Sequence, residues 1–424
     1  MPALRLFGQN TTFTKKMMFD VIVIGGGAAG MLAAAMSAEF GSNVALIEKN
    51  EFMGRKLRIT GKGRCNVTNN SPVRQVIENI PTGGKFLYGA ISSFSPEDVM
   101  FMFQEKMGIP LKTERGGRVF PVSDKATDIV DALYRRVKNA GVRIIRAVAK
   151  EVITADGAVC GVKTDKGSYE CKSVILCTGG ASYPLTGSDG SGYVIARKLG
   201  HTIVEPRPSL VPLVEDGDYC SRMQGLSLRN VAVKVFDDGK KPVFEGFGEM
   251  LFTHFGVSGP LALSASSHMR DFKNKSYRMQ IDLKPALDEK TLDARLLRDF
   301  EAMSNKDFSN VLGGLASRMM VPVLIERSGI PADTKVHSIT KEQRKTLLEL
   351  LKCFEIKIEG PRPISEAIIT SGGVDTKEIN PKTMESKLIS GLYFAGEIID
   401  ADAYTGGYNL RIAWSTARAA AMNA

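Results

Sequence analysis

The residues with the clearest chemical potential are three glycines near the start of the chain, Gly25, Gly27 and Gly30, in the segment FDVIVIGGGAAG. An apolar, β-branched run precedes them and an alanine-rich run follows, so the spacing predicts a strand, a tight turn and a helix over Ala28–Glu39. Gly25 allows the turn, Gly27 allows a pyrophosphate to approach the backbone, and Gly30 allows the helix to pack on the strand. The helix start offers unpaired N–H groups to phosphates.

A carboxylate completes this pattern at the end of a second predicted strand, residues 43–47. Glu48 lies 18 residues after Gly30, where it can accept hydrogen bonds from the ribose of adenosine and disfavours a 2′-phosphate. The alternative, a glycine-rich turn without a ligand, fits this context less well. The pattern therefore predicts a dinucleotide site but does not distinguish NAD from FAD.

Two motifs near the other end of the chain favour FAD. Gly396 and Glu397 follow the apolar run LYFA, and a carboxylate there can accept hydrogen bonds from the ribityl hydroxyls of a flavin. The sequence TGGYN, residues 405–409, precedes the last predicted helix, whose positive N-terminus could face the flavin N1/C2=O edge. A plain strand end and a plain helix start are the alternatives.

The basic segment GRKLRITGKGRCNVTNN, residues 54–70, follows Glu48 closely and could be a reactive-thiol loop, a nucleic-acid patch or a cofactor cradle. Arg55 and Lys56 can neutralise pyrophosphate charge, and the glycines of the segment allow the backbone to come close to the cofactor. Nearby cations could lower the pKa of the Cys65 thiol, which leaves the reactive-thiol alternative open. Because Cys65 has no partner cysteine in the sequence, we interpret it as a thiol that shapes the flavin site.

Composition excludes several classes of protein. The 424 residues include six Cys without a Cys-x-x-Cys pair and only four His, which argues against a disulfide reductase, structural zinc and a multi-His metal site; no metal is expected. Scattered thiols fit a reducing cytosol, so we expect a cytoplasmic protein. The net charge of +10 is spread along the chain between acids, so we expect no nucleic-acid partner, and no stretch is long enough to span a membrane.

The chain is long enough for two or three domains. We predict an α/β fold with a discontinuous Rossmann-like FAD-binding domain, residues 19–202 plus 360–424, which holds separate strands at 168–171 and in SVILCTGG. A β-rich insert is expected over 203–285 plus about 353–360, and a helical insert over 286–352. Residues 1–18 look like an extension, either a leader or the consequence of an alternative start near Met17 or Met18.

Longer stretches carry a resemblance to known flavoproteins. The sequence VILCTGGASYPLTGSDGSGYVIARKLGH resembles the fumarate reductase and ketosteroid dehydrogenase flavoproteins of the glutathione-reductase-like, two-dinucleotide-fold superfamily. GRKLRITGKGRCNVTN, FTHFGVSGP and the stretch 370–420 more closely resemble the BaiN/RdsA-type NAD(P)/FAD-dependent oxidoreductases, which include aminoacetone-oxidase-like members. The likeness runs from about Phe19 to the end, although Lys62 replaces the third glycine of the family's 61–63 loop.

The resemblance implies a β-barrel-like and a helical insertion, and FAD contacts over the dinucleotide turn, the basic segment and the far motifs. The backbone of Val148 is placed where this superfamily often meets the adenine. The implied cofactor-binding residues are Gly25, Gly27, Ala28, Ala29, Gly30, Glu48, Lys49, Arg55, Lys56, Thr60, Gly61, Gly63, Arg64, Cys65, Asn66, Val148, Thr178, Gly179, Gly180, Gly396, Glu397, Gly407, Tyr408, Asn409 and Leu410.

Catalytic groups are harder to identify because flavin carries the redox chemistry itself. His254, in FTHFGVSGP, and Tyr408 are the candidate proton donors, although a lone His is more often structural and packing explains a Tyr equally well. Arg118, in RGGRVFP, could bind an anionic substrate, with a surface salt bridge as the more common alternative. No second Gly-x-Gly-x-x-Gly unit exists, so a dedicated NAD(P)H domain is absent. Either nicotinamide docks transiently over the flavin, or the substrate is the reductant and oxygen the oxidant.

We therefore expect an FAD-dependent oxidoreductase that transfers hydride or electrons between FAD and a small organic substrate. NAD(P)H-dependent reduction of an activated C=C bond is one version, and amine oxidation with oxygen, as in aminoacetone-oxidase-like members, is the alternative. A tRNA-acting flavoprotein and a non-enzymatic flavin-binding module are alternatives from other classes. The sequence leaves the oligomeric state open.

Overall fold

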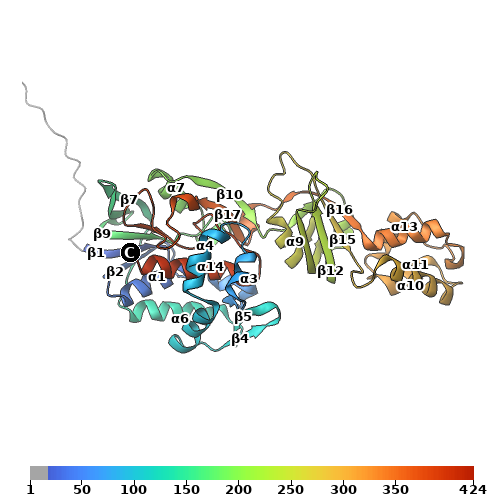
Figure 1. Ribbon diagram of the computed structural model, residues 1–424, viewed down its shortest axis with the longest axis horizontal. Helices are drawn as coiled ribbons and strands as arrows, with labels where there is room; N and C mark the ends of the chain where they lie inside the picture. The colour runs from blue at the N-terminus through green and yellow to red at the C-terminus, as the bar shows by residue number, and fades with distance from the viewer. Residues whose placement is uncertain (1–17) are drawn as a thin grey trace, which may run out of the picture. The chain divides into compact units, whose positions relative to one another are not determined.

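The computed structural model describes residues 18–424, so the expected N-terminal extension lies almost wholly outside the described residues (Figure 1). The chain divides into two units: one runs up to Arg207 and resumes at Ile369, and the other comprises Pro208–Ile368. The expected limits at 202/203 and about 360 remain predictions for the domain boundaries. No helix among residues 18–424 has both the length and the apolar character needed to cross a bilayer.

A seven-stranded sheet forms the centre of the first unit, with the order β6-β2-β1-β9-β8-β7 and β18 beside β9. Its parallel strands are short and apolar, as expected where both faces are covered. All five residues of β2 are buried, for example. The parallel strands are β1 (Met18–Ile24), β2 (Val44–Glu48), β6 (Arg143–Arg146), β9 (Gly167–Leu176) and β18 (Leu392–Phe394).

The strand β9 has two different partners along the same edge. Its first half pairs antiparallel with β8 (Ala158–Thr164), which in turn pairs with β7 (Ala149–Ala155). Its second half pairs parallel with β18, which comes from the far end of the chain. The prediction of separate strands at 168–171 and in SVILCTGG was wrong, because one continuous strand serves both neighbours.

Helices cover the parallel sheet (Figure 1). The first helix, α1, occupies Ala28–Glu39 as predicted from the sequence and packs against the last helix, α14 (Tyr408–Ala421). Trp414 is completely buried in α14, and its indole N–H donates to the carbonyl of Val67 at 2.8 Å. The other α-helices of this unit are α2 (Arg55–Ile59), α3 (Val73–Glu78), α4 (Gly84–Ser93), α5 (Pro96–Phe101), α6 (Ala126–Asn139) and α7 (Ser191–Lys198).

Two small sheets complete the first unit. The strands β3 (Thr68–Asn69), β5 (Arg118–Pro121) and β4 (Leu111–Glu114) form an antiparallel sheet in that order. The strands β10 (Ile203–Ser209) and β17 (Ile369–Val374) form a pair at the two crossings between the units. Asn69 of β3 donates to the carbonyl of Gly406 at 2.9 Å, which ties the first small sheet to the start of α14.

The second unit contains a closed six-stranded barrel and a group of helices, in agreement with the predicted β-barrel-like and helical insert. The barrel order is β11 (Leu213–Glu215), β14 (Gly256–Ser258), β13 (Phe244–Thr253), β12 (Ser227–Phe236), β15 (Tyr277–Asp282) and β16 (Phe354–Pro361). The helices are α8 (Tyr219–Arg222), α9 (Gly259–Ser266), α10 (Glu289–Ala302), α11 (Phe308–Leu315), α12 (Val321–Ser328) and α13 (Lys341–Lys352).

One buried histidine predicts how stability changes with pH. His201 is 2% exposed, its Nε2 lies 2.9 Å from Ser386 Oγ, and its ring packs edge-on against Phe394. Its Nδ1 has no hydrogen-bond partner among residues 18–424. Burial lowers the His201 pKa, although Glu378 acts in the opposite direction. The histidine is therefore protonated more readily in the unfolded chain than in the folded one. The contribution of neutral His201 to the free energy of unfolding is complete above pH ~6.5 and decreases as the pH falls below that value.

We expect this loss to be smaller in His201→Asn, which removes the titration. Chemical unfolding at pH 7.5, 6.5 and 5.5 measures it, and the wild-type slope attributable to His201 is at most ~1.4 kcal/mol per pH unit. His337→Asn, which changes an exposed histidine in the second unit, is the matched control and should keep the wild-type slope. Equal slopes for wild type and His201→Asn would contradict the argument.

Candidate functional site at the carboxyl edge of the parallel sheet

Main-chain hydrogen bonds align the ends of the parallel strands. Gly25 N–H donates to Ile47 at 2.8 Å, Cys177 N–H donates to Ile24 at 2.8 Å, and Ala395 N–H donates to Leu176 at 3.1 Å. Each bond continues the strand ladder by one residue. The glycine turn and the segments that begin at Thr178 and Gly396 therefore lie in one row, where ligands bind in open α/β sheets.

The three fingerprint glycines have different surroundings. Gly25 has φ +105°, and a Cβ there would lie 2.5 Å from the Cys177 carbonyl oxygen. A Cβ on Gly30 would overlap the Gly25 carbonyl oxygen, so this glycine is required for α1 to pack on the turn. A Cβ on Gly27 would meet no atom within 4 Å. The chain thus leaves open space at the position assigned to the pyrophosphate.

The start of α1 has free donors. No side chain caps the helix at Gly27, and the first intrahelical bond is made by Met31 N–H to the Gly27 carbonyl at 3.0 Å. The N–H groups of Ala28, Ala29 and Gly30 consequently have no partner within the helix. Three donors at a helix N-terminus beside an open space fit an anionic group.

Glu48 is a buried acceptor, only 6% exposed. Its carboxylate accepts from Gly26 N–H at 2.5 Å, from Asn50 N–H at 2.7 Å and from Asn50 Nδ2 at 2.8 Å. A carboxylate has about four acceptor positions, so capacity for a ribose hydroxyl remains. The neighbouring Lys49 does not pair with Glu48 but forms an ion pair with Asp189, with Nζ 2.7 Å from Oδ2.

Glu397 collects partners from three other parts of the chain. It forms a 2.7 Å ion pair with Lys56 and accepts from Ser182 Oγ at 3.0 Å and from Thr370 N–H at 2.8 Å. The Lys56 and Glu397 side chains are 22% and 21% exposed, so water still reaches the pair. Sequence reasoning named Lys56 and Glu397 separately but missed their contact, and it missed Ser182 and Thr370, because no spacing rule relates residues so far apart.

The glycine segment after β9 is closely surrounded by this network. A Cβ on Gly180 would lie 3.0 Å from a Glu397 carboxylate oxygen, and Gly179 has φ +74°. Thr178 Oγ1 is buried without a hydrogen-bond partner among the described residues, and a Cβ on Gly192 of α7 would overlap it. The Thr178 hydroxyl therefore packs against the first turn of α7.

The basic segment is held mainly by its own backbone. Gly61 and Lys62 have φ +57° and +59°, and Gly63 has φ +84°. Thr60 Oγ1 donates to Leu57 at 2.7 Å, and the Asn66 side chain accepts from Val119 N–H at 3.2 Å. The segment also includes Arg55, whose guanidinium reaches the Asn50 side chain at 3.1 Å.

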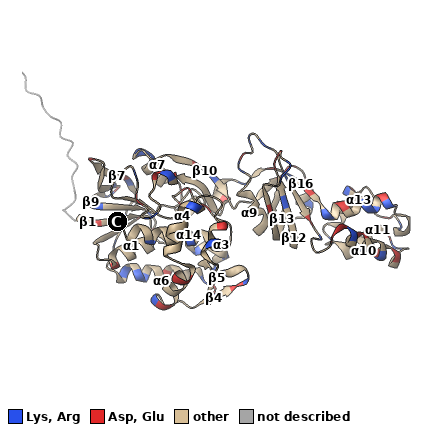
Figure 2. Ribbon diagram, viewed as in Figure 1, with Lys and Arg blue, Asp and Glu red and all other residues tan. Residues whose placement is uncertain are grey.

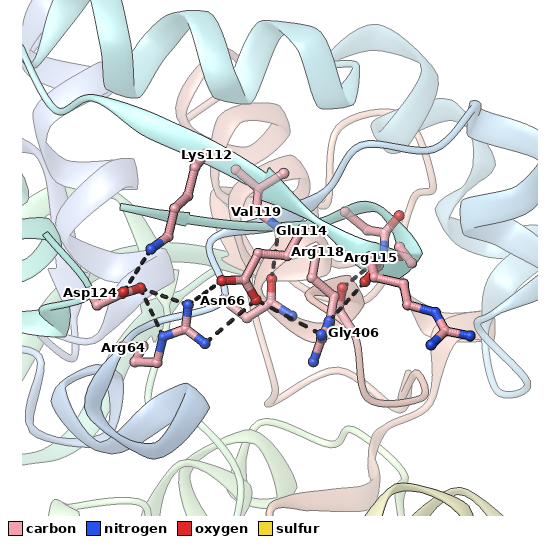
Figure 3. Close-up of polar contacts among 11 residues, drawn as sticks. Arg64, Asn66, Lys112, Glu114, Arg115, Arg118, Val119, Asp124 and Gly406 are labelled. Atoms are coloured by element: carbon pink, nitrogen blue, oxygen red, sulfur yellow. Dashed lines mark hydrogen bonds and ion pairs between the residues drawn. The ribbon is translucent and has the colours of Figure 1, made fainter. Parts of the chain in front are cut away.

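The nearby cations do not lower the pKa of the Cys65 thiol, an effect that the sequence left open. The residue is completely buried, and burial raises the pKa of its thiol to about 12, against a smaller lowering by the hydrogen bond with Thr60. The nearby cation of Arg64 does not help, because its guanidinium is paired with Glu114 and with Asp124 at 2.7 Å (Figure 3). Cys65 thus remains a neutral thiol.

Two proposed cofactor contacts have protein partners in this structure. Arg64 lies over the Phe120 ring, 4.1 Å from its centre, in addition to its two carboxylates. Val148 donates its N–H to the Asp165 carboxylate at 2.8 Å and accepts from Asp165 N–H at 3.0 Å. Contacts of FAD with the Arg64 side chain and the Val148 backbone stay predictions.

The start of α14 is fixed from several sides. Gly407 has φ +100°, and a Cβ there would overlap the Thr68 carbonyl oxygen. Asn409 donates from Nδ2 to the Ala403 carbonyl at 2.8 Å, so its side chain holds the preceding loop. No side chain caps α14, and the N–H groups of Tyr408, Asn409 and Leu410 face outward from its first turn.

The two candidate proton donors lie in different units. Tyr408 is 6% exposed, and burial raises its pKa although the Ser71 hydroxyl, a hydrogen-bond partner, lowers it. It is therefore a neutral phenol at physiological pH. His254 is exposed at the turn between β13 and β14, with its ring edge-on to Phe255. Both catalytic roles stay predictions.

These features are those of a dinucleotide-binding enzyme of the flavoprotein class: one glycine turn, one buried carboxylate suited to a ribose, and a second carboxylate and helix start suited to a flavin. The residues fit FAD because Gly27 leaves space, α1 leaves donors and Glu48 leaves acceptor capacity.

The chain belongs to the family described as HI0933-like protein Rossmann domain, whose model matches residues 19–423. The protein is an FAD-dependent oxidoreductase of this family. It is 32% identical over 410 residues to a protein of Haemophilus influenzae named ribosomal RNA dihydrouridine synthase, with 95% of this chain and 97% of that protein covered. It is 28% identical to the 3-dehydro-bile acid delta(4,6)-reductase of Clostridium scindens, with 93% and 96% covered.

Solved structures show the same fold. The 3-ketosteroid-delta4-(5alpha)-dehydrogenase of Rhodococcus jostii RHA1 matches with a TM-score of 0.50 and 14% identity, over 98% of each chain. The 3-ketosteroid delta1-dehydrogenase of Sterolibacterium denitrificans matches with a TM-score of 0.51 and 12% identity, over 96% of this chain and 99% of that one.

The two glycines of the fingerprint should separate folding from cofactor binding. Gly30→Ala forces α1 away from the turn, and we expect it to lower the free energy of unfolding of the apoprotein by about 1–3 kcal/mol. Gly27→Ala should change that free energy by less than about 1 kcal/mol but weaken FAD binding at least about tenfold, because its methyl group enters the open space.

Chemical unfolding of apoprotein and fluorescence titration with FAD measure both effects. Gly89→Ala in α4, whose Cβ would meet only the Pro381 carbonyl at 3.8 Å, is the control and should retain both stability and affinity. Wild-type FAD affinity in Gly27→Ala would place the pyrophosphate elsewhere.

Thiol accessibility tests the surroundings of Cys65. At pH 8, a maleimide should modify exposed Cys160 in native protein while Cys65 stays unmodified, since the reactive thiolate of Cys65 is suppressed by burial. Peptide mass mapping reads the sites, and Cys160→Ser should lose the fast modification. Modification of Cys65 as fast as that of Cys160 would show that the thiol is accessible and ionised.

Proposed function

We propose that the protein reduces a C=C bond conjugated to a carbonyl group, with FAD as the hydride carrier and a nicotinamide as the donor. The observation that carries this proposal is a bond change shared by relatives that match the chain over nearly its whole length. Formation of dihydrouridine saturates the C5=C6 bond of uracil, next to the C4 carbonyl. A delta(4,6) reductase acting on a 3-oxo compound saturates double bonds conjugated to that oxo group.

The proposed roles of the chain's residues are binding and orientation. The three donors at the start of α1 hold the pyrophosphate, and Glu48 holds the adenosine ribose. Glu397, oriented by Lys56, Ser182 and Thr370, accepts from the ribityl chain. The start of α14 presents N–H groups to the N1/C2=O edge, where they stabilise negative charge. FAD, when bound there, can take a hydride from a nicotinamide and deliver it to the carbon β to the substrate carbonyl.

The overall reaction consumes one nicotinamide hydride and one proton for each C=C bond. The proton is delivered to the carbon α to the carbonyl, and Tyr408 and His254 are the candidate donors. Tyr408 is protonated at neutral pH because burial raises its pKa, which suits a donor. Support for transient nicotinamide docking comes from the sequence, which contains one dinucleotide fingerprint.

Uridine in RNA is the first candidate substrate. The expectation of no nucleic-acid partner is at odds with the names of two relatives, the Haemophilus influenzae protein and an Escherichia coli protein that is 31% identical over 412 residues and is also called ribosomal RNA dihydrouridine synthase. The excess of cations belongs to the first unit: residues 1–207 and 369–424 carry 33 Lys and Arg against 24 Asp and Glu, whereas residues 208–368 carry 23 against 22 (Figure 2 colours those of the described residues).

A small cyclic enone is the second candidate, favoured by the similarity to the bile acid reductase. The two candidates share the reacting group and differ in what surrounds it. Both differ from amine oxidation, which needs oxygen as the oxidant and an amine as the hydride donor.

An anaerobic titration tests the proposal. We expect NADPH or NADH to bleach the yellow flavin, and one equivalent of 2-cyclohexenone or of uridine in an rRNA fragment to restore the colour. Mass spectrometry should then find the enone or the uridine heavier by two hydrogen atoms. A fragment without uridine and a reaction without nicotinamide are the controls.

The other outcomes identify the alternatives. A flavin that nicotinamides leave oxidised, but that forms hydrogen peroxide with amines in air, would establish an amine oxidase. A flavin that no donor reduces would indicate a binding module, and a protein that cannot be reconstituted with FAD would overturn the whole reading.

A further inference from the structure

The β4–β5 hairpin carries three cations, Lys112, Arg115 and Arg118, that are not among the residues assigned to FAD, and together with Arg64 they form a cluster. The cluster consists of Arg64, Lys112, Arg115 and Arg118 with two acids, Glu114 and Asp124 (Figure 3). We call it the hairpin cluster. Its four cations face only two carboxylates among the described residues.

The two acids are already neutralised by the inner pair of cations. Arg64 bonds to Glu114 and to Asp124, and Lys112 reaches Asp124 at 2.6 Å. Hydrogen bonds from Arg64 and Lys112 hold the pKa of both acids below their usual range, so both stay ionised. The inner part of the hairpin cluster is therefore balanced at any pH of interest.

The outer pair of cations is not balanced. Arg115 is exposed and has no ion pair among the described residues, and no dashed line reaches its guanidinium in Figure 3. Arg118 is 47% exposed and lies 3.8 Å from Glu114, which Arg64 already occupies. Its Nε donates to the Arg115 carbonyl at 3.1 Å, which holds the two arginines on one turn.

This turn is fixed beside the start of α14. Asn69 Nδ2 donates both to the Gly116 carbonyl at 3.0 Å and to the Gly406 carbonyl at 2.9 Å, so one amide group joins the turn to the residue before the α14 N-cap. Asn70 N–H donates to the Gly117 carbonyl at 2.7 Å. The Asn69 Oδ1 accepts from Ser71 Oγ at 2.5 Å, and Ser71 in turn contacts the Tyr408 hydroxyl.

We propose that Arg115 and Arg118 bind an oxyanion of the substrate, a carboxylate or a phosphodiester, and so hold its reacting C=C bond near the start of α14. The assignment rests on the proposed function, because it takes the start of α14 as the flavin end of the site. Each guanidinium offers N–H donors in a planar fork, the geometry that carboxylate and phosphate oxygens accept, although Arg118 Nε already donates to the Arg115 carbonyl. The exposed fractions leave this face open to a ligand.

A comparison of an anionic substrate with its neutral ester tests whether Arg115 and Arg118 bind an oxyanion. The probes are 4-oxo-2-cyclohexene-1-carboxylate, its methyl ester and a short uridine-containing oligoribonucleotide. The variants are Arg115→Ala, Arg118→Ala and the double variant, with Arg115→Lys as the conservative change. Arg135→Ala is the matched control, because it removes another exposed arginine, on α6, that forms no ion pair with the part of the chain that the structure describes.

For the double variant we expect kcat/KM for the carboxylate to fall about tenfold or more while the value for the methyl ester changes less than twofold. KM should carry the change, and the rate of flavin reduction by NADPH should stay constant. Arg115→Lys should recover part of the preference. For the oligoribonucleotide, the slope of log affinity against log salt concentration should decrease by about one for each phosphate contact removed.

The outcomes distinguish a carboxylate from a phosphodiester as the bound oxyanion, and they also test whether the arginines bind an anion at all. Loss confined to the carboxylate or to the oligoribonucleotide would assign the oxyanion to that source. An unchanged acid-to-ester ratio and an unchanged salt slope in the double variant would overturn the role of the arginines.

Substrate binding is also followed through the absorbance of the oxidised flavin, which needs no turnover. If wild-type protein reduces none of the probes, the proposed reaction fails, and these binding curves still decide whether the two arginines recognise the anion. FAD content and thermal midpoint of each variant confirm that it is folded.

Discussion

The main-chain hydrogen bonding at the end of the parallel sheet is the constraint on which the site depends. The register pairs Ile24 with Ile47 on one side and with Leu176 on the other, and Leu176 with Phe394. A shift of one residue would turn buried side chains toward the opposite face, so the register is strongly specified. The glycine turn begins one residue beyond this line and the segments at Thr178 and Gly396 begin two residues beyond it, so their positions follow from the register rather than from their own loops.

The ion pair between Lys56 and Glu397 can form only after the end of the chain has added its strand to the sheet. Glu397 follows β18, which adds to the sheet only when the end of the chain returns, and its other partners come from segments around Ser182 and Thr370. A partly buried carboxylate is costly unless it is paired and hydrogen-bonded. The network is therefore satisfied only when all four segments are in place, which couples assembly of the site to closure of the discontinuous unit.

The sequence predicted those parts of the site in which local chemistry and local structure coincide. The bounds of α1, the place of Glu48 at the end of β2, and the return of the last strand and helix followed from glycine spacing and apolar runs. The sequence could not decide whether cations act on Cys65, because the direction of the Arg64 guanidinium depends on Glu114 and Asp124, acids that β4 and the loop after β5 bring near. The sequence predicted two strands in place of the single strand β9, because its two halves pair with different neighbours and therefore differ in their residue patterns. Nothing in the sequence pairs Asn69 with the RGG turn, since only the assembled small sheet brings them together.

The electrostatic potential of the first unit depends on the cations that have no carboxylate partner, not on the total number of Lys and Arg. Lys49, Lys56 and Arg64 all belong to the segments assigned to FAD, yet each is directed to a carboxylate of the protein. Such pairs fix loops in place and contribute little net potential at a distance. The field that a substrate meets is therefore set by unpaired groups such as Arg115 and by helix N-termini. A small number of uncompensated donors at a fixed edge can select an anionic substrate, whereas a net charge of +10 by itself selects none.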